Sequence, residues 1–287
     1  MSKIALVTDS SAYIPKVLVG DYPIHIAPLQ VIWNGEVFRD GVDIKPNEFY
    51  ARLENSKTMP TTSQPSPADF IEIYKSLLDQ GYEILSVHIS SKLSGTHDSA
   101  IQAKKALSNS NKIELVDSLS ASMAMGFPIL AAAKAASRGA SLSDCKLIVE
   151  KALENTGVLF AVNTLEFLHR GGRIGSAAAF LGTALNMKPI LELREGKSEA
   201  VQRVRSMKKA IDRLIELALE KFKDQDTIRY AILHANAPGE ANNLLERIRK
   251  ELDVHKVHEA VCTEVSPAIG THTGPATIGV TYQVGIV

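Results

Sequence analysis

Hydrophobic residues in the first half of the chain fall into short runs that alternate with helical patterns. The short runs, which are typical of buried strands, cover residues 4–7, 24–32, 84–89 and 113–116. Helical patterns are found at residues 46–50, 68–80, 95–107 and 121–138. Strands that alternate with helices indicate a parallel sheet covered on both faces. Ligands of such sheets bind outside the carboxyl ends of the strands.

The second half of the chain has a different pattern, because it contains a hairpin. Residues 195–198 form its predicted turn. Strands are predicted at residues 158–162, 189–193, 200–204, 230–233, 257–265 and 276–284, and helices at 142–155, 177–185, 207–222 and 241–252. We therefore predict a two-domain α/β protein. Residues 1–152 form a three-layer α/β/α domain with a parallel sheet, and residues 153–287 form an α/β domain with a mixed sheet.

The composition is that of an ordinary globular protein, with 45% hydrophobic and 22% charged residues among 287. Lys and Arg together number 32, as do Asp and Glu, so the formal net charge is zero. A nucleic-acid-binding protein normally carries a basic surplus that meets phosphates. The charge balance therefore argues against nucleic acid as a partner.

Cysteines and histidines give no sign of a metal site or a disulfide framework. Cys145 and Cys262 lie far apart, and the histidines lack metal-ligand spacing. The N-terminus lacks a secretory apolar region, and no apolar run reaches the roughly 18–20 residues that span a bilayer. We therefore expect a cytoplasmic protein without metal or cofactor.

The first of three polar segments is a predicted loop at residues 58–67. Ser66 and Pro67, at its end, are typical of a helix N-cap followed by a first-turn proline. This structural role does not explain the three hydroxyls upstream, Thr61, Thr62 and Ser63. These three residues are therefore candidates for ligand binding.

The second segment, Ser94, Gly95 and Thr96, follows a predicted strand and opens a predicted helix. The N-terminus of a helix binds anions readily, and glycine permits close approach of the backbone. A simple serine N-cap explains the segment equally well. The P-loop lysine and the G-x-G-x-x-G spacing are both absent. A carboxylate or a single phosphate therefore fits better than a nucleotide.

The third segment, residues 269–275, lies between the last two predicted strands and contains His272 and Thr273. His272 can donate a hydrogen bond to an anion or act as an acid or base, and a solvated histidine in a turn is the structural alternative. Together with Ser94 it makes a serine-type acyl hydrolase an alternative function. The nucleophile elbow G-x-S-x-G is absent, however, and no carboxylate can be assigned behind His272. A regulator that binds a sugar or a nucleotide is a third alternative.

Five sequence segments, in order along the chain, resemble the DegV family of fatty-acid-binding proteins. They read VTDSSAYIP, MPTTSQPSP, ISSKLSGTHDSA, TLEFLHRGGRIG with downstream KPIL, and AIGTHTGPATIGV. Each segment is weak by itself, but five in register over nearly the full length are specific. The resemblance implies two α/β domains with a long-chain fatty acid, such as palmitate, in an apolar tunnel between them.

The resemblance also implies roles for particular residues and partners. Thr62, Ser94 and His272 match the residues that bind the carboxylate, with Thr61, Ser63, Gly95, Thr96 and Thr273 on the same loops. Family members of one type present the acid to a separate kinase, which makes an acyl-phosphate for fatty acid metabolism. The implied protein is thus a lipid-binding monomer rather than an enzyme, and transient membrane contact is compatible with this role.

Arg170 and Arg173 frame two glycines and are candidates for contact with the kinase. The planar guanidinium group pairs well with phosphate. A tight glycine turn with two solvated arginines is the structural alternative.

Overall fold

The computed structural model of the protein describes residues 3–182 and 187–286. In its first half, β1 (Lys3–Asp9), β2 (Ile24–Ala27), β6 (Tyr82–His88) and β7 (Ile113–Asp117) form a sheet in the order β2-β1-β6-β7. All neighbouring strands in this sheet are parallel. The alternation of strands and helices in the sequence predicted this arrangement correctly.

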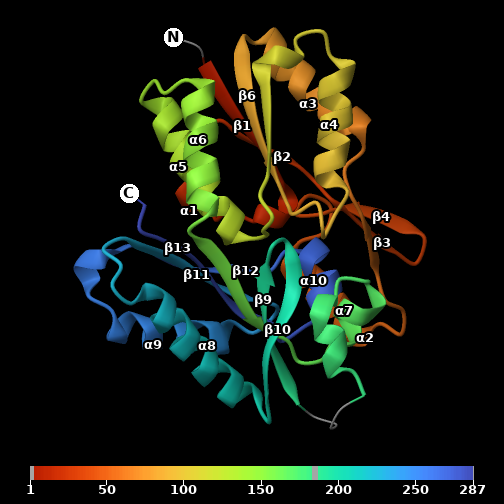
Figure 1. Ribbon diagram of the computed structural model, residues 1–287. Coiled ribbons are helices and arrows are strands. Elements are labelled where there is room, and N and C mark those ends of the chain that lie inside the picture. Colours follow the sequence, from red (N-terminus) through yellow and green to blue (C-terminus); the bar gives the residue numbers. More distant parts are fainter. Residues whose placement is uncertain (1–2, 183–186, 287) are drawn as a thin grey trace.

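Helices cover both faces of the parallel sheet (Figure 1). On one face lie α3 (Pro67–Asp79) and α4 (Thr96–Ala106), where Phe70 and Tyr74 pack on inward-facing strand residues. On the other face lie α5 (Met123–Ser137) and α6 (Leu142–Leu153), where Ile129 and Val149 pack on the sheet. The predicted three-layer α/β/α architecture is confirmed.

A small antiparallel sheet, in the order β4-β3-β5, lies beside the parallel sheet. The hairpin of β3 (Gln30–Trp33) and β4 (Glu36–Arg39) turns at Asn34 and Gly35, and both residues have positive φ angles of 54° and 81°. Its third strand, β5 (Thr61–Ser63), lies within the segment predicted as a loop. This prediction was wrong because pairing with β3, a distant segment, makes these polar residues a strand. Helix α2 (Pro46–Asn55) packs beside this sheet.

The second half forms a mixed sheet in the order β10-β9-β8-β13-β11-β12. The strands are β8 (Thr156–Ala161), β9 (Lys188–Arg194), β10 (Lys197–Val204), β11 (Ile228–His234), β12 (Val257–Glu264) and β13 (Ile278–Val284). β11 and β12 are parallel, and the other pairs are antiparallel. Helices α8 (Met207–Phe222) and α9 (Pro238–Glu251) cover one face with a common apolar core. The predicted mixed sheet is confirmed.

The other face of the mixed sheet meets the first half of the chain. Met123, Phe127 and Leu130 of α5 form one buried cluster with Ala231 of β11, and Ala124 packs in another with Val158 of β8. The described strands of the parallel sheet end by residue 117, and those of the mixed sheet begin at residue 156. The domain boundary after residue 152 stays a prediction.

Two predicted elements of the second half differ from the structure. Residues 177–185 were expected to form a helix, but a short 3-10 helix, η3 (Gly175–Phe180), lies there, and residues 183–185 lie outside the described part. Gly175 and Gly182 both have positive φ angles, which an α-helix does not tolerate. The turn expected near His272 is a helix, α10 (Pro267–Thr273). Its end signals are clear, since the Ser266 hydroxyl accepts from the amide of Ile269 and Gly274 terminates it at φ 77°.

Short elements complete the described chain. They are η1 (Ser10–Ala12), α1 (Lys16–Val19), η2 (Ser110–Lys112), α7 (Glu166–Arg170) and η4 (Val254–Lys256). Among them, α7 is important for the site because it packs against α10.

Candidate functional site

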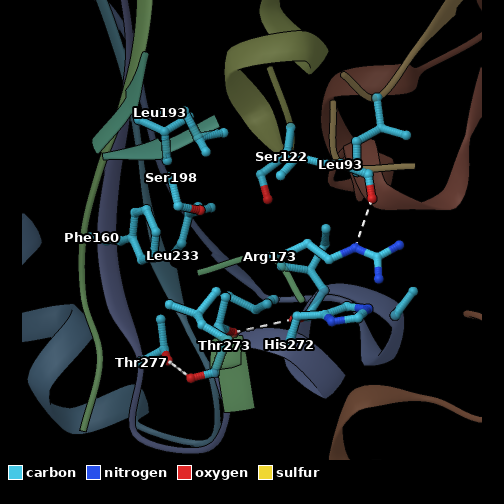
Figure 2. A pocket seen from close by; sticks show the side chains of 18 of the residues that line it. Leu93, Ser122, Phe160, Arg173, Leu193, Ser198, Leu233, His272, Thr273 and Thr277 are labelled. Carbon is cyan, nitrogen blue, oxygen red and sulfur yellow. Dashed lines mark hydrogen bonds between the residues drawn. The ribbon is translucent and has the colours of Figure 1, made fainter. Parts of the chain in front are cut away.

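A cavity of about 820 Å³, including its open end, lies between the two halves of the molecule. Both halves supply its apolar wall, which includes Leu29, Ile89, Leu93, Phe160, Leu193 and Leu233. At one end of the cavity, Thr62, Arg173 and His272 form a polar part of the wall, and Figure 2 shows the last two of these residues. The cavity suits a long apolar ligand with one polar end.

Two residues far apart in the sequence meet at this polar end. The Oγ1 atom of Thr62 lies 2.7 Å from Nε2 of His272, at hydrogen-bonding distance. Thr62 stands on β5, and His272 stands near the end of α10. Both side chains line the cavity. The elements that sequence analysis misassigned, a strand and a helix, are thus the ones that hold this pair in place.

The imidazole of His272 is neutral at neutral pH. Burial, assisted by the positive charge of Arg173, lowers the pKa of His272 from 6.5 to about 4. Its Nδ1 atom is buried and has no hydrogen-bond partner within the described residues. A neutral imidazole carries one N–H group, which can donate a hydrogen bond to a ligand carboxylate.

Arg173 supplies a fixed positive charge in the same wall. Its Nε donates to the carbonyl of Leu93 at 2.9 Å, and Nη1 donates to the carbonyl of Gly171 at 2.6 Å. Figure 2 shows the bond to Leu93, which joins the two halves of the chain across the site. The solvated arginine that sequence analysis considered is therefore wrong for Arg173. This arginine stands in the cavity wall.

Gly171 is a site residue whose role sequence analysis missed. A Cβ atom at this position would stand 2.1 Å from Nδ1 of His272, so only glycine lets the chain pass the imidazole. The Gly171-Gly172 pair was a visible signal in the sequence, but nothing local linked it to a histidine about a hundred residues away.

The loop after β6 brings Ser94 to the cavity. The carboxylate of Asp9 accepts a hydrogen bond from the amide of Ile89 at 2.8 Å, which fixes the start of this loop. The hydroxyls of Ser94 and Thr96 are 2.8 Å apart. Ser94 lines the cavity, whereas Thr96 is fully buried beside it. The N-cap of α4 is Gly95, not Ser94, so the simple serine cap is wrong.

The other predicted loop residues have mixed placements. Thr273 lines the cavity, and its hydroxyl donates to the carbonyl of Ile269. Ser63 bonds weakly to the neighbouring Gln64 carbonyl and is not part of the cavity wall, because side chains alternate along β5. Ser66 caps α3 through the amide of Asp69, as predicted.

An outer hollow of about 560 Å³ adjoins the polar end of the cavity. Thr61 and Arg170, both exposed, line it, while Thr62, Arg173 and His272 belong to both spaces. Arg170 forms an ion pair with Glu166 at 2.7 Å. The three shared residues therefore stand between the apolar cavity and a hollow that faces the surface.

The geometry does not assemble the triad of a serine hydrolase. Nε2 of His272 is bonded to Thr62 rather than Ser94, and its Nδ1 has no carboxylate partner among the described residues. A serine nucleophile needs both contacts. Within residues 3–182 and 187–286, no cluster of three or more metal-ligating side chains occurs. Over the same residues, no helix is long and apolar enough to cross a bilayer.

Comparison with known proteins agrees with this architecture. A family profile described as uncharacterised protein, DegV family, matches residues 3–284. A DegV domain-containing protein of Clostridium perfringens is 36% identical over 282 residues, which cover 97% of this chain and 98% of that protein. The chain belongs to the DegV family, as its sequence motifs predicted.

Solved structures give the same fold. A DegV family protein from Thermus thermophilus, described by its fatty acid binding, superimposes with a TM-score of 0.91 at 37% identity, covering 98% of this chain and 99% of that one. A stearic acid-binding protein from Eubacterium ventriosum superimposes with a TM-score of 0.90 at 25% identity, covering 99% of each chain. Both of these structural relatives are described as binding fatty acids.

Proposed function

We propose that this protein binds one long-chain fatty acid, such as palmitate, in the cavity between its two halves. The observation that carries the proposal is an apolar cavity closed at one end by Thr62, Arg173 and His272. The carboxylate accepts hydrogen bonds from neutral donors and meets the charge of Arg173, and such charge-assisted bonds are strong. Each buried CH₂ of the tail contributes about 0.8 kcal/mol. The tail therefore dominates affinity, and the head group sets orientation.

The outer hollow supports a second part of the proposal, presentation of the bound acid to a fatty-acid kinase. The proposed carboxylate site borders this hollow, which the exposed Thr61 and Arg170 also line. A carboxylate oxygen attacks the γ-phosphorus of ATP held by the kinase, which gives acyl-phosphate and ADP. The fatty-acid-binding protein itself positions the acid and catalyses nothing alone. We place this role in the cytoplasm, where the two free cysteine thiols stay reduced. The proposed protein is a monomer that contacts membranes transiently.

Extraction of the purified, folded protein tests the binding proposal. Mass spectrometry should find about one long-chain fatty acid per chain, and added palmitate should raise the melting temperature of delipidated protein because it binds only the folded state. Absence of lipid together with no thermal shift would refute the proposal. Sustained hydrolysis of a long-chain nitrophenyl ester that Ser94→Ala abolishes would establish the hydrolase instead. A thermal shift with phosphorylated sugars or nucleotides, and none with lipids, would favour a regulator.

A further inference from the structure

Six side chains with hydroxyl groups line the cavity: Thr62, Ser94, Ser122, Ser198, Thr273 and Thr277. Four of them already have partners in the protein. Thr62 pairs with His272 and Ser94 with Thr96, while Thr273 and Thr277 donate to backbone carbonyls of their own segment. The Oγ atoms of Ser122 and Ser198 form no hydrogen bond with any residue that the structure describes.

The side chain of Ser122 does not form the capping hydrogen bond that its position offers. It is the N-cap residue of α5, where a serine hydroxyl ordinarily accepts a hydrogen bond from the first turn of the helix, yet its side chain makes no such bond. Its backbone has φ 53° and ψ −146°, a conformation that is costly for a residue with a side chain. The residue is only 5% exposed, and Figure 2 shows its hydroxyl directed into the cavity. The local structure thus turns a polar group toward the ligand.

Ser198 presents a second hydroxyl to the same space. It stands on β10, is 3% exposed, and lies near Phe160 and Leu193 in Figure 2. The carbonyl of Ser198 packs against Gly175, where a Cβ atom would stand 1.9 Å away, so this part of the strand is held closely. An apolar residue would suit this inward position if only a hydrocarbon chain passed it.

A plain alkyl chain leaves both hydroxyls buried without partners, which is unfavourable. Resting on the proposed function, we infer that Ser122 and Ser198 adapt this cavity to long-chain fatty acids that carry a hydroxyl group along the chain. A serine hydroxyl both donates and accepts, so each of the two can form a hydrogen bond with a hydroxyl group of the ligand. In Figure 2 both serines lie apart from His272. The ligand hydroxyl therefore sits along the chain and not beside the carboxylate.

Binding of paired ligands to the delipidated full-length protein tests this inference. The ligands are stearate, a hydroxystearate with its hydroxyl in the middle of the chain, and one with its hydroxyl next to the carboxylate. Wild-type protein should bind the mid-chain hydroxystearate more tightly than stearate. In the double variant Ser122→Ala/Ser198→Ala, the ratio of the two affinities should fall about tenfold, because two hydrogen bonds are lost. Stearate itself should bind the double variant at least as well.

Thr277→Val is the matched control, since it removes a cavity hydroxyl that already donates to the carbonyls of Thr273 and Gly274. It should leave the ratio of affinities at the wild-type value. If the ratio is the same in wild type and double variant while stearate binds, the two serines do not read the chain and this inference is wrong. If no fatty acid binds the wild type at all, the proposed function fails first. The carboxylate-proximal isomer should show no dependence on either serine, and such a dependence would also contradict the inference.

Discussion

The buried imidazole of His272 makes the stability of the fold depend on pH. Its pKa is about 4 in the folded protein and 6.5 when exposed, so the unfolded chain takes up this proton first as pH falls. The contribution of the neutral His272 imidazole to the free energy of unfolding is fully present above pH 6.5 and is lost as pH falls toward 4. A difference of about 2.5 pKa units at about 1.4 kcal/mol per unit corresponds to roughly 3 kcal/mol.

Asp40 opposes this effect over nearly the same range. Burial raises the pKa of its carboxyl from 3.8 to about 7, although a hydrogen bond from the Ser10 hydroxyl, 2.7 Å away, lowers it. Here the folded protein holds the proton more tightly, so stability falls as pH rises from 3.8 to about 7. The same conversion gives roughly 4 kcal/mol. The two contributions offset each other in the wild type between pH 4 and 6.5.

Urea unfolding across this pH range separates the two groups. The free energy of unfolding of the wild type, relative to that of His272→Gln, should fall by roughly 3 kcal/mol between pH 6.5 and 4. Glutamine keeps a donor and an acceptor near Thr62. The free energy of unfolding of the wild type, relative to that of Asp40→Asn, should rise over the same pH range. Asp40→Asn is therefore the matched control. A difference between wild type and His272→Gln that is constant over this range would refute a buried, neutral imidazole.

Three further predictions concern the turn, the carboxylate site and the two arginines. Gly196→Ala should destabilise the fold by about 1–3 kcal/mol beyond Gly35→Ala in thermal or urea unfolding, because both glycines have φ near +80° but only the Cβ at 196 meets a neighbour, at 2.4 Å. Thr62→Val should weaken palmitate binding by about 1.5–3 kcal/mol in calorimetry with little change in melting temperature, and equal affinity would place the carboxylate elsewhere. Arg173→Gln should weaken fatty-acid binding, because this residue lines the cavity. Arg170→Glu should leave binding unchanged and lower acyl-phosphate formation with the kinase, and normal acyl-phosphate formation with this variant would exclude a docking role for Arg170.

Much of the fold could be predicted from the sequence because its signals are local. The periodicity of residues 207–222 predicted α8 at its observed bounds, and Ser66 with Pro67 predicted the start of α3. Strand β5 could not be predicted in this way, since its sequence is polar and only pairing with β3 defines it. Local pattern fails where a distant segment decides the structure.

For the same reason, only part of the candidate site could be predicted from the sequence. Family motifs identified Thr62, Ser94 and His272, and all three line one cavity. The motif that contains Arg173 indicated a special turn, but not that its guanidinium would bond the carbonyl of Leu93 inside the wall. Ser122 had no signal, since a serine before a helix is ordinarily a cap. Which way a side chain faces depends on packing between the two halves.

The pairing of a neutral imidazole with a fixed guanidinium also sets how binding responds to pH. In the proposed complex, the carboxylate brings a negative charge near His272 and therefore raises the pKa of this histidine above its value of about 4. Binding is then coupled to proton uptake, so affinity for the acid should increase as pH falls toward that pKa, provided the fatty acid stays ionised. At neutral pH the imidazole remains a neutral donor and Arg173 supplies the nearby positive charge. In the proposed complex, a single cation orients the carboxylate and leaves it negatively charged. The carboxylate needs this charge to attack a phosphoryl group as a nucleophile.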